Sequence, residues 1–256
     1  MEIWSLAIAG LAGLVCGFLN TVASSGSAVS LPILMSLGLH AIDANATNRI
    51  PVLVGAVTAT VELARRKAIP WRMAFAVSTP TTVGAAGGAF LAEAIPSHDL
   101  RLFIVAAVVV ALLLIVTKLK DIINAAVGGE RRFGLREAAL FFVVGLWLGF
   151  IVLDGATYLL LVLVLSVRLP LVEANAIKNF VLVPTTIVAM LVFASKGSIH
   201  WPLGSVMAIG SVIGGLAGAR LSVSAQAKKW IVGLLITVIV GELIHLTVRY
   251  YLELFA

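Results

Sequence analysis

The chain has little of what a soluble protein needs. Only 12% of its 256 residues are charged, whereas 61% are hydrophobic, and its mean hydropathy is +1.12. Too few polar side chains remain to cover a soluble globule of this size, so the composition predicts an integral membrane protein. The apolar runs are continuous and do not alternate at period two, which excludes a β-barrel and leaves membrane-spanning helices.

Several common catalytic and ligand-binding motifs are also absent from the sequence. Cys16 is the single cysteine, which excludes disulfides and Cys-based metal sites. The sequence has no phosphate-binding Gly-Lys-Ser/Thr loop, no His-Glu-x-x-His and no nucleophile–base pair at helical spacing. We therefore expect no enzyme, cofactor, metal or nucleic-acid partner. We attribute the net charge of +6 to short basic loops between spans. The N-terminus lacks the basic region of a cleaved signal peptide, so we interpret the first apolar run as a retained span.

One plan of apolar runs occurs twice along the chain. The first run, 3–20, is broken at Ser24-Ser25-Gly26-Ser27 and followed by an arm, 28–38, that covers about half of a ~30 Å hydrocarbon core. In the second half, run 138–153 is broken at Asp154-Gly155 and followed by a short arm, 158–167. Each half then continues with three apolar segments, namely 46–64, 73–92 and 100–117, and 176–195, 203–219 and 230–248.

Matching landmarks support an internal repeat. Ala44-Asn45-Ala46 recurs as Ala174-Asn175-Ala176, and Gly17-Phe18 recurs as Gly149-Phe150. We expect each half to contain a broken or re-entrant first hairpin followed by three transmembrane helices. The expected units are a first repeat at 1–119, a charged cytoplasmic linker at 120–137 and a second repeat at 138–256.

The basic residues indicate the topology. If each short arm returns to its starting side, most of the 18 Lys and Arg residues fall on one side, which the positive-inside rule makes cytoplasmic. Both termini then lie on the non-cytoplasmic side. Each half makes an odd number of passes, so the expected fold is an all-α membrane protein with two inverted-topology repeats. Secondary transporters have this architecture, and their substrate sites lie near the midplane where broken helices meet.

Two polar stretches stand at matching positions of the halves. Asn48-Arg49 and Lys178-Asn179 each place one cation beside one Asn, in swapped order. Only about 22 Å of helix separates Arg49 from Arg65, so either the bilayer thins there or Arg49 lies below the interface, in the hydrocarbon core. An intramembrane cation predicts an anion site, although both cations could instead snorkel to lipid headgroups. Asn45 and Asn175 either line that site or tie each hairpin to the next helix.

The two breaks carry further candidates. Ser24-Ser25-Gly26-Ser27 offers hydroxyl and backbone N–H groups suited to an oxyanion, or alternatively an N-cap for the following arm. Asp154 is a candidate for proton coupling, for pairing with Lys178 or Arg49, or for capping. Four-residue glycine spacings are expected to pack helices closely and leave homo-oligomerisation open; they are Gly84/Gly88 and Gly210/Gly214/Gly218.

Together these residues resemble the TauE/SafE family, the sulfite exporter and sulfonate permease group of bacterial membrane proteins. The resemblance covers essentially the whole chain, including the broken first segment, Gly17-Phe18 through Pro32-Ile33-Leu34, and the polar stretch Ala44 to Pro51. It implies a multi-pass inner-membrane exporter of sulfite, sulfoacetate or another organosulfonate. The headgroup would be met by Arg49, Lys178, Asn side chains and helix ends.

The expected function is therefore an alternating-access carrier whose partners are a small anion, the lipid bilayer and, as a candidate coupling ion, the proton. The site set adds Asn48, Asn179 and the Ser24 to Ser27 break to the two cations. The alternatives are a passive anion channel or uniporter, a carrier of a small carboxylate, and a non-transporting membrane assembly factor.

Overall fold

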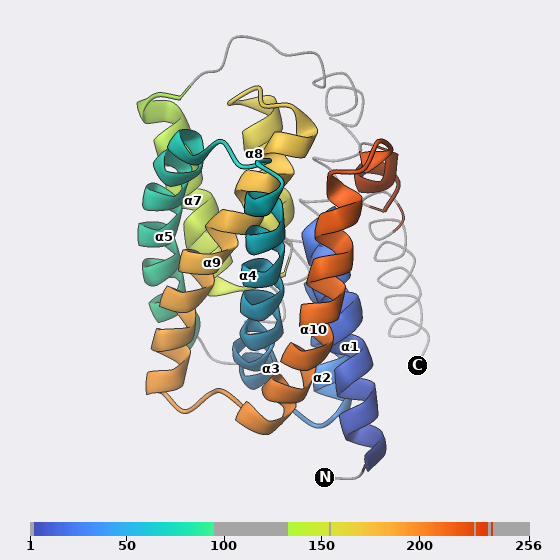
Figure 1. Cartoon of the computed structure of the whole chain (residues 1–256). Coiled ribbons are helices and arrows are strands. Elements are labelled where there is room, and N and C mark those ends of the chain that lie inside the picture. Colours follow the sequence, from blue (N-terminus) through green and yellow to red (C-terminus); the bar gives the residue numbers. More distant parts are fainter. Residues whose placement is uncertain (1–2, 95–132, 154, 228, 235–236, 238–256) are drawn as a thin grey trace, which may run out of the picture.

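The computed structural model describes residues 3–94, 133–153, 155–227, 229–234 and 237, and over these ranges the chain is all-helical. The segment 100–117, most of 120–137 and of 230–248, and Asp154 lie outside the described residues. The helices, shown in Figure 1, are α1 (Ile3–Ala23), α2 (Gly26–Ser36), α3 (Ala41–Thr47), α4 (Arg49–Arg65), α5 (Trp71–Ala94), α7 (Leu135–Phe150), α8 (Gly155–Leu165), α9 (Leu171–Ser195) and α10 (Trp201–Ser222).

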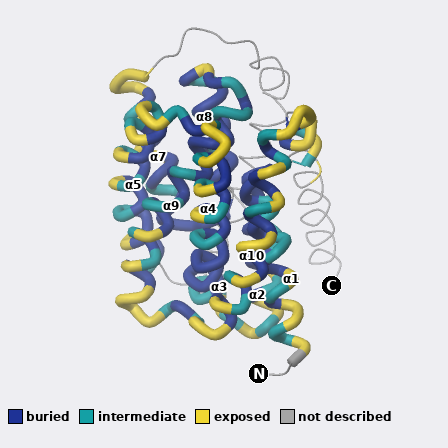
Figure 2. Tube along the Cα trace, viewed as in Figure 1, coloured by how far each residue is buried: buried dark blue, intermediate teal, exposed yellow. Residues whose placement is uncertain are grey.

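The helices have the length and surface of a membrane protein. Three of them, within α1, α9 and α10, are long and apolar enough to cross a bilayer. Figure 2 shows buried residues through the centre of the bundle and exposed ones around its outside. Large apolar side chains such as Phe75, Leu191 and Ile209 are exposed on that outer surface. A soluble protein would bury such side chains, whereas lipid solvates them.

The two short arms form as predicted. They are the apolar helices α2 and α8, both too short to span a bilayer. Figure 1 shows α2 beside α3 at the lower end of the molecule and α8 at the upper end. The two breaks nevertheless meet, because the Thr157 hydroxyl donates to the carbonyl oxygen of Ser24 at 3.5 Å. Ser24 itself turns the chain with a φ of 66°, which is uncommon for a residue other than glycine.

Glycines bring helices of different halves into close contact. A methyl group added at Gly13 would overlap the carbonyl of Met207, and one at Gly145 would overlap that of Thr81. The predicted glycine faces are confirmed, since Gly84, Gly88, Gly210 and Gly214 lie equally close to backbone atoms. As a result, α1 packs along α10, and α5 packs along α7.

The ends of two helices repeat in detail. Lys67 and Gly197, which follow α4 and α9, both have positive φ, at 55° and 76°. Each donates its N–H to an alanine carbonyl three residues earlier, Ala64 or Ala194, as helices do when a left-handed residue ends them. The two turns are 130 residues apart, which is also the offset between Ala44-Asn45-Ala46 and Ala174-Asn175-Ala176.

One segment differs between the halves. The second half has a single helix, α9, where the first half has α3 and α4 separated at Asn48. Pro51 lies in the first turn of α4 and lacks the N–H that would bind the carbonyl of Thr47. The residue at the matching position is Val181, so the helix there continues.

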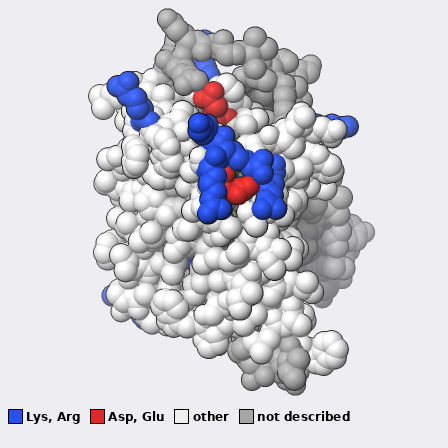
Figure 3. Space-filling view, in the orientation of Figure 1, with Lys and Arg blue, Asp and Glu red and all other residues white. Residues whose placement is uncertain are grey.

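Basic residues gather at the upper end of the molecule, where α4 and α10 end (Figure 3). The Glu62 carboxylate oxygen there lies 2.8 Å from Arg66 Nε and 3.4 Å from Arg220 Nε. Glu62 and Arg66 belong to the end of α4, and Arg220 belongs to α10. This cluster therefore connects helices of the two halves.

Candidate functional site

Arg49 lies inside the protein and not at the lipid headgroups, with an exposed fraction of 1%. Its Nη1 donates to the carbonyl oxygen of Leu148 at 3.0 Å, and its Nη2 donates to that of Gly149 at 2.6 Å. These carbonyls belong to the last turn of α7, where intrahelical partners are missing and the helix dipole is negative. The ring of Phe193 covers the guanidinium, with 4.8 Å between Cζ and the ring centroid.

Lys178 makes the corresponding contact from the other half. It is fully buried, and its Nζ donates to the carbonyl oxygens of Asn20 at 2.6 Å and Thr21 at 3.2 Å. Both carbonyls belong to the last turn of α1. The cation of each half thus binds the C-terminal end of the first helix of the other half, where carbonyl groups are left without helical partners.

The asparagines hold the same junctions. Asn45 brackets the second break, because its Nδ2 donates to the carbonyl of Phe150 and its Oδ1 accepts from the N–H of Val152. Asn179 donates to the carbonyls of Thr21 and of Asn175. Asn45 therefore ties its segment to the break of the other half, and not its own hairpin to the next helix as the sequence suggested. These contacts place the two cations and the two breaks in one region.

Asn48 belongs to a polar network at the first break. Its Oδ1 accepts from the Ser30 hydroxyl at 2.6 Å and lies 3.9 Å from the Cys16 sulfur. Asn20 extends the network, since its Oδ1 accepts from the Gly26 N–H at 2.9 Å and its Nδ2 lies 3.5 Å from the Cys16 sulfur. Asn20 and Ser30 were missed by the sequence analysis. A signal was available in the sequence. Asn20 lies four residues after Cys16, and Ser30 lies four residues after Gly26, so each pair shares one helix face.

Several polar atoms at this break have no partner. Buried polar groups are normally hydrogen-bonded, so each exception needs an explanation. Ser25 occupies the N-cap position of α2 but makes no side-chain capping hydrogen bond, which excludes the predicted capping role for its hydroxyl. Within the described part of the chain, the buried atoms without a partner here are the hydroxyls of Ser24, Ser25 and Ser27, Asn48 Nδ2 and Arg49 Nε.

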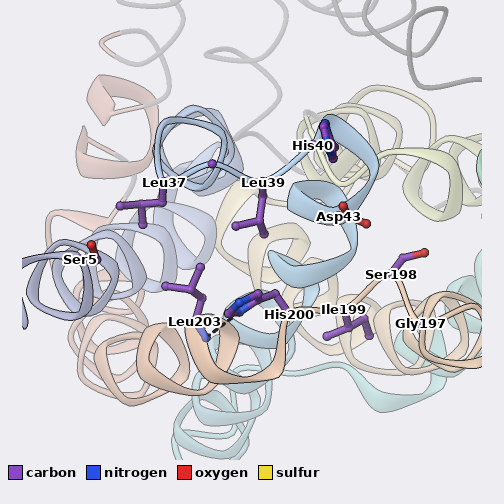
Figure 4. A pocket seen from close by; sticks show the side chains of 11 residues that line it. Ser5, Leu37, Leu39, His40, Asp43, Gly197, Ser198, Ile199, His200 and Leu203 are labelled. Atoms are coloured by element: carbon purple, nitrogen blue, oxygen red, sulfur yellow. Dashed lines mark hydrogen bonds between the residues drawn. The ribbon is translucent and has the colours of Figure 1, made fainter. Parts of the chain in front are cut away.

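A cavity of about 420 Å³ opens at the lower end, between the α2–α3 turn and the α9–α10 loop (Figure 4). His200, on its wall, donates its backbone N–H to the Thr47 hydroxyl at 2.9 Å. Thr47 immediately precedes Asn48, so the cavity wall contacts the segment that carries the site residues. The lining combines the polar side chains of Ser5, His40, Asp43, Ser198 and His200 with Leu37, Leu39, Ile199 and Leu203.

Comparison with known proteins agrees with this architecture. The family model described as sulfite exporter TauE/SafE matches residues 9–243. The chain is 27% identical to the probable membrane transporter protein YfcA of Escherichia coli, over 84% of this chain and 80% of that protein. It is 24% identical to the probable membrane transporter protein ORF9 of a Sinorhizobium species, over 87% of this chain and 85% of that protein. A probable membrane transporter protein of Haemophilus influenzae is 27% identical over 84% of each chain.

No solved structure matches this chain significantly. The family match nevertheless extends over nearly the whole sequence and includes both breaks and both buried cations. It confirms the resemblance inferred from the residues, and the relatives' names agree with a membrane transporter. The chain belongs to the TauE/SafE sulfite exporter family.

Proposed function

We propose that this protein is a secondary transporter that exports a small sulfur oxyanion, such as sulfite, sulfoacetate or another organosulfonate, by alternating access. The observation that carries the proposal is the reciprocal contact of the two buried cations. Arg49 binds the end of α7, and Lys178 binds the end of α1. Broken helices whose ends meet polar groups inside a bundle are the substrate-binding elements of secondary transporters.

The arrangement of the helices supports inverted repeats. The short arms α2 and α8 lie at opposite ends of the molecule (Figure 1). The contacts of the first half are mirrored by those of the second, since α1 packs on α10 as α7 packs on α5. In the proposed orientation, which follows the positive-inside rule, the basic end faces the cytoplasm of a bacterial inner membrane and both termini lie on the other side.

The same contacts suggest which parts move. One group of helices contains α1, α4 and α10, and the other contains α5, α7 and α9, with α4 and α9 in contact between them. Arg49 and Lys178 cross from one group to the other, and with Asn45 and Asn179 they frame the junction of the breaks. Asn175 instead binds the Ser222 hydroxyl at the end of α10. Rocking of the groups about this junction would expose it to one side at a time.

The cavity at the lower end is the proposed outer end of the transport route, because its wall contacts the segment that carries Asn48 and Arg49. The lower end is the one remote from the basic cluster, so in this topology it faces away from the cytoplasm. An anion released there passes the Thr47–His200 contact. Asp154, at the second break and outside the described residues, is the proposed proton-coupling residue.

The direct test is uptake and efflux of sulfite by proteoliposomes containing the purified protein, with and without an imposed proton gradient. The proposal predicts saturable sulfite movement above that of empty liposomes. Accumulation that follows the proton gradient, and that Asp154→Asn abolishes while leaving downhill flux, supports coupling. The absence of flux with sulfite, sulfoacetate, taurine and isethionate would refute the proposed function.

A further inference from the structure

The two halves offer an anion different chemistry. We propose that the oxyanion headgroup binds at the first break alone, where Ser24, Ser25, Ser27, Asn48 and the Nε of Arg49 donate to it. Lys178 and Asn179 are then positioning residues that hold the end of α1 and do not contact the anion. This inference rests on the proposed transport function, but it makes a separate claim about where the ligand lies.

The first break presents unused donors. The hydroxyls of Ser24, Ser25 and Ser27 are buried, with exposed fractions of 2%, and have no partner in the described part of the chain. The Asn48 side chain is fixed by the Ser30 hydroxyl on its oxygen, which leaves Nδ2 as the unpaired atom. An oxyanion with several deprotonated oxygens is a ligand that would satisfy such a set of donors.

The Arg49 guanidinium is held so that its Nε edge remains available to a ligand. Its two Nη atoms are engaged by the carbonyls of Leu148 and Gly149, and Phe193 covers the face of the guanidinium. Its Nε is buried and unpaired. A guanidinium fixed in this way can bind an oxyanion through the Nε edge without leaving α7.

Helix α2, which follows the first break, also favours a negative ligand. Ser25 stands at the N-cap of α2, an 11-residue helix, so the three serines surround its positive N-terminal end. Asn20 occupies only the N–H of Gly26 there. The unpaired hydroxyls and the helix dipole therefore favour the same negative ligand.

The buried side-chain nitrogens of the second half are each already bound to the protein. Lys178 Nζ donates two of its three N–H groups to carbonyls, and Asn179 Nδ2 donates to the carbonyls of Thr21 and Asn175. Asn175 Nδ2 is bound to the Ser222 hydroxyl. Among the described residues of this half, the buried side-chain atom without a partner is Asn175 Oδ1, an acceptor that repels an oxyanion.

The decisive experiment is calorimetric titration of the purified full chain in detergent with sodium sulfite and with sulfoacetate. The triple variant S24A/S25A/S27A is expected to bind at least about tenfold more weakly, because it removes donors to a charged ligand. Serine-to-alanine changes are small enough to keep the fold. Thr60→Val and Thr82→Val, which remove buried unpaired hydroxyls elsewhere on α4 and α5, are matched controls expected to keep wild-type affinity.

A variant of the second half completes the test. Asn179→Leu is expected to lower the melting temperature while changing the sulfite affinity of the folded protein by less than about twofold. Wild-type affinity in the triple serine variant, or an equal loss in Asn179→Leu, would overturn the one-sided site while leaving transport intact. Absence of anion binding and flux in the wild-type protein would instead refute the proposed function itself.

Discussion

Arg49 Nη2 lies 2.6 Å from the carbonyl oxygen of Gly149, across 100 residues of sequence. The contact joins the start of α4 to the end of α7 and leaves the Nε of the same guanidinium unpaired. One residue therefore caps a helix of the other half and keeps a buried N–H without a partner, next to Asn48 in the sequence. This double role separates the consequences of changing Arg49 from those of changing Lys178.

Arg49→Lys is expected to keep the fold and lose anion affinity. An ammonium can still donate to the carbonyls of Leu148 and Gly149, but it lacks the Nε edge and the planar fork of a guanidinium. We expect sulfite to bind at least about tenfold more weakly, as measured by calorimetry, with a melting temperature near that of the wild-type protein. Unchanged affinity would remove Arg49 from the site.

Lys178→Met is expected to act mainly on stability. Methionine fills similar space without a buried charge, but the carbonyl of Asn20 loses its charged donor, whereas that of Thr21 keeps Asn179. Leaving a buried acceptor unsatisfied costs about 1–3 kcal/mol, so the melting temperature in detergent should fall clearly. If the stability is unchanged, Lys178 does not hold α1 in the way the contacts indicate.

Gly145→Ala tests the close packing of α5 and α7. The added methyl group would overlap the backbone of Thr81, so the helices must separate, at a cost of about 1–3 kcal/mol. Gly233→Ala is the matched control, because no atom of the described residues lies within 4 Å of the added methyl group there. Thermal denaturation followed by fluorescence compares the two variants. Equal melting temperatures would contradict the packing.

Cys16 reports on access to the first break without any engineering, because it is the only cysteine of the chain and is buried beside Asn48 and Asn20. Alkylation by a water-soluble maleimide should be slow and should change in rate when sulfite is added, since binding shifts the population of open states. A rate that sulfite does not alter, in protein that binds sulfite, would argue against movement at this break.

The sequence predicted the general plan well because hydrophobic runs, breaks and glycine spacings are local signals. The arms α2 and α8 and the glycine faces follow directly from them. The burial of Arg49 also followed from helix length, because a short interval to Arg65 places the cation below the interface.

The partners of the polar residues could not be predicted in this way. Which carbonyls Arg49 and Lys178 bind depends on how helices 99 to 158 residues apart in sequence come together. Asn20 and Ser30 look like isolated polar residues in apolar runs until the network at Asn48 is seen. The second half has one continuous helix, α9, where the first half has α3 and α4, and a difference that agrees with this is Pro51 against Val181.

The measurement that tests the account most directly is counterflow of radiolabelled sulfite in proteoliposomes preloaded with unlabelled sulfite. An alternating-access carrier exchanges one anion for another, so the labelled anion should accumulate transiently inside, and the S24A/S25A/S27A variant should lose most of that accumulation. Sulfite flux that only equilibrates, without a transient overshoot in the wild-type protein, would contradict the carrier mechanism and indicate a channel.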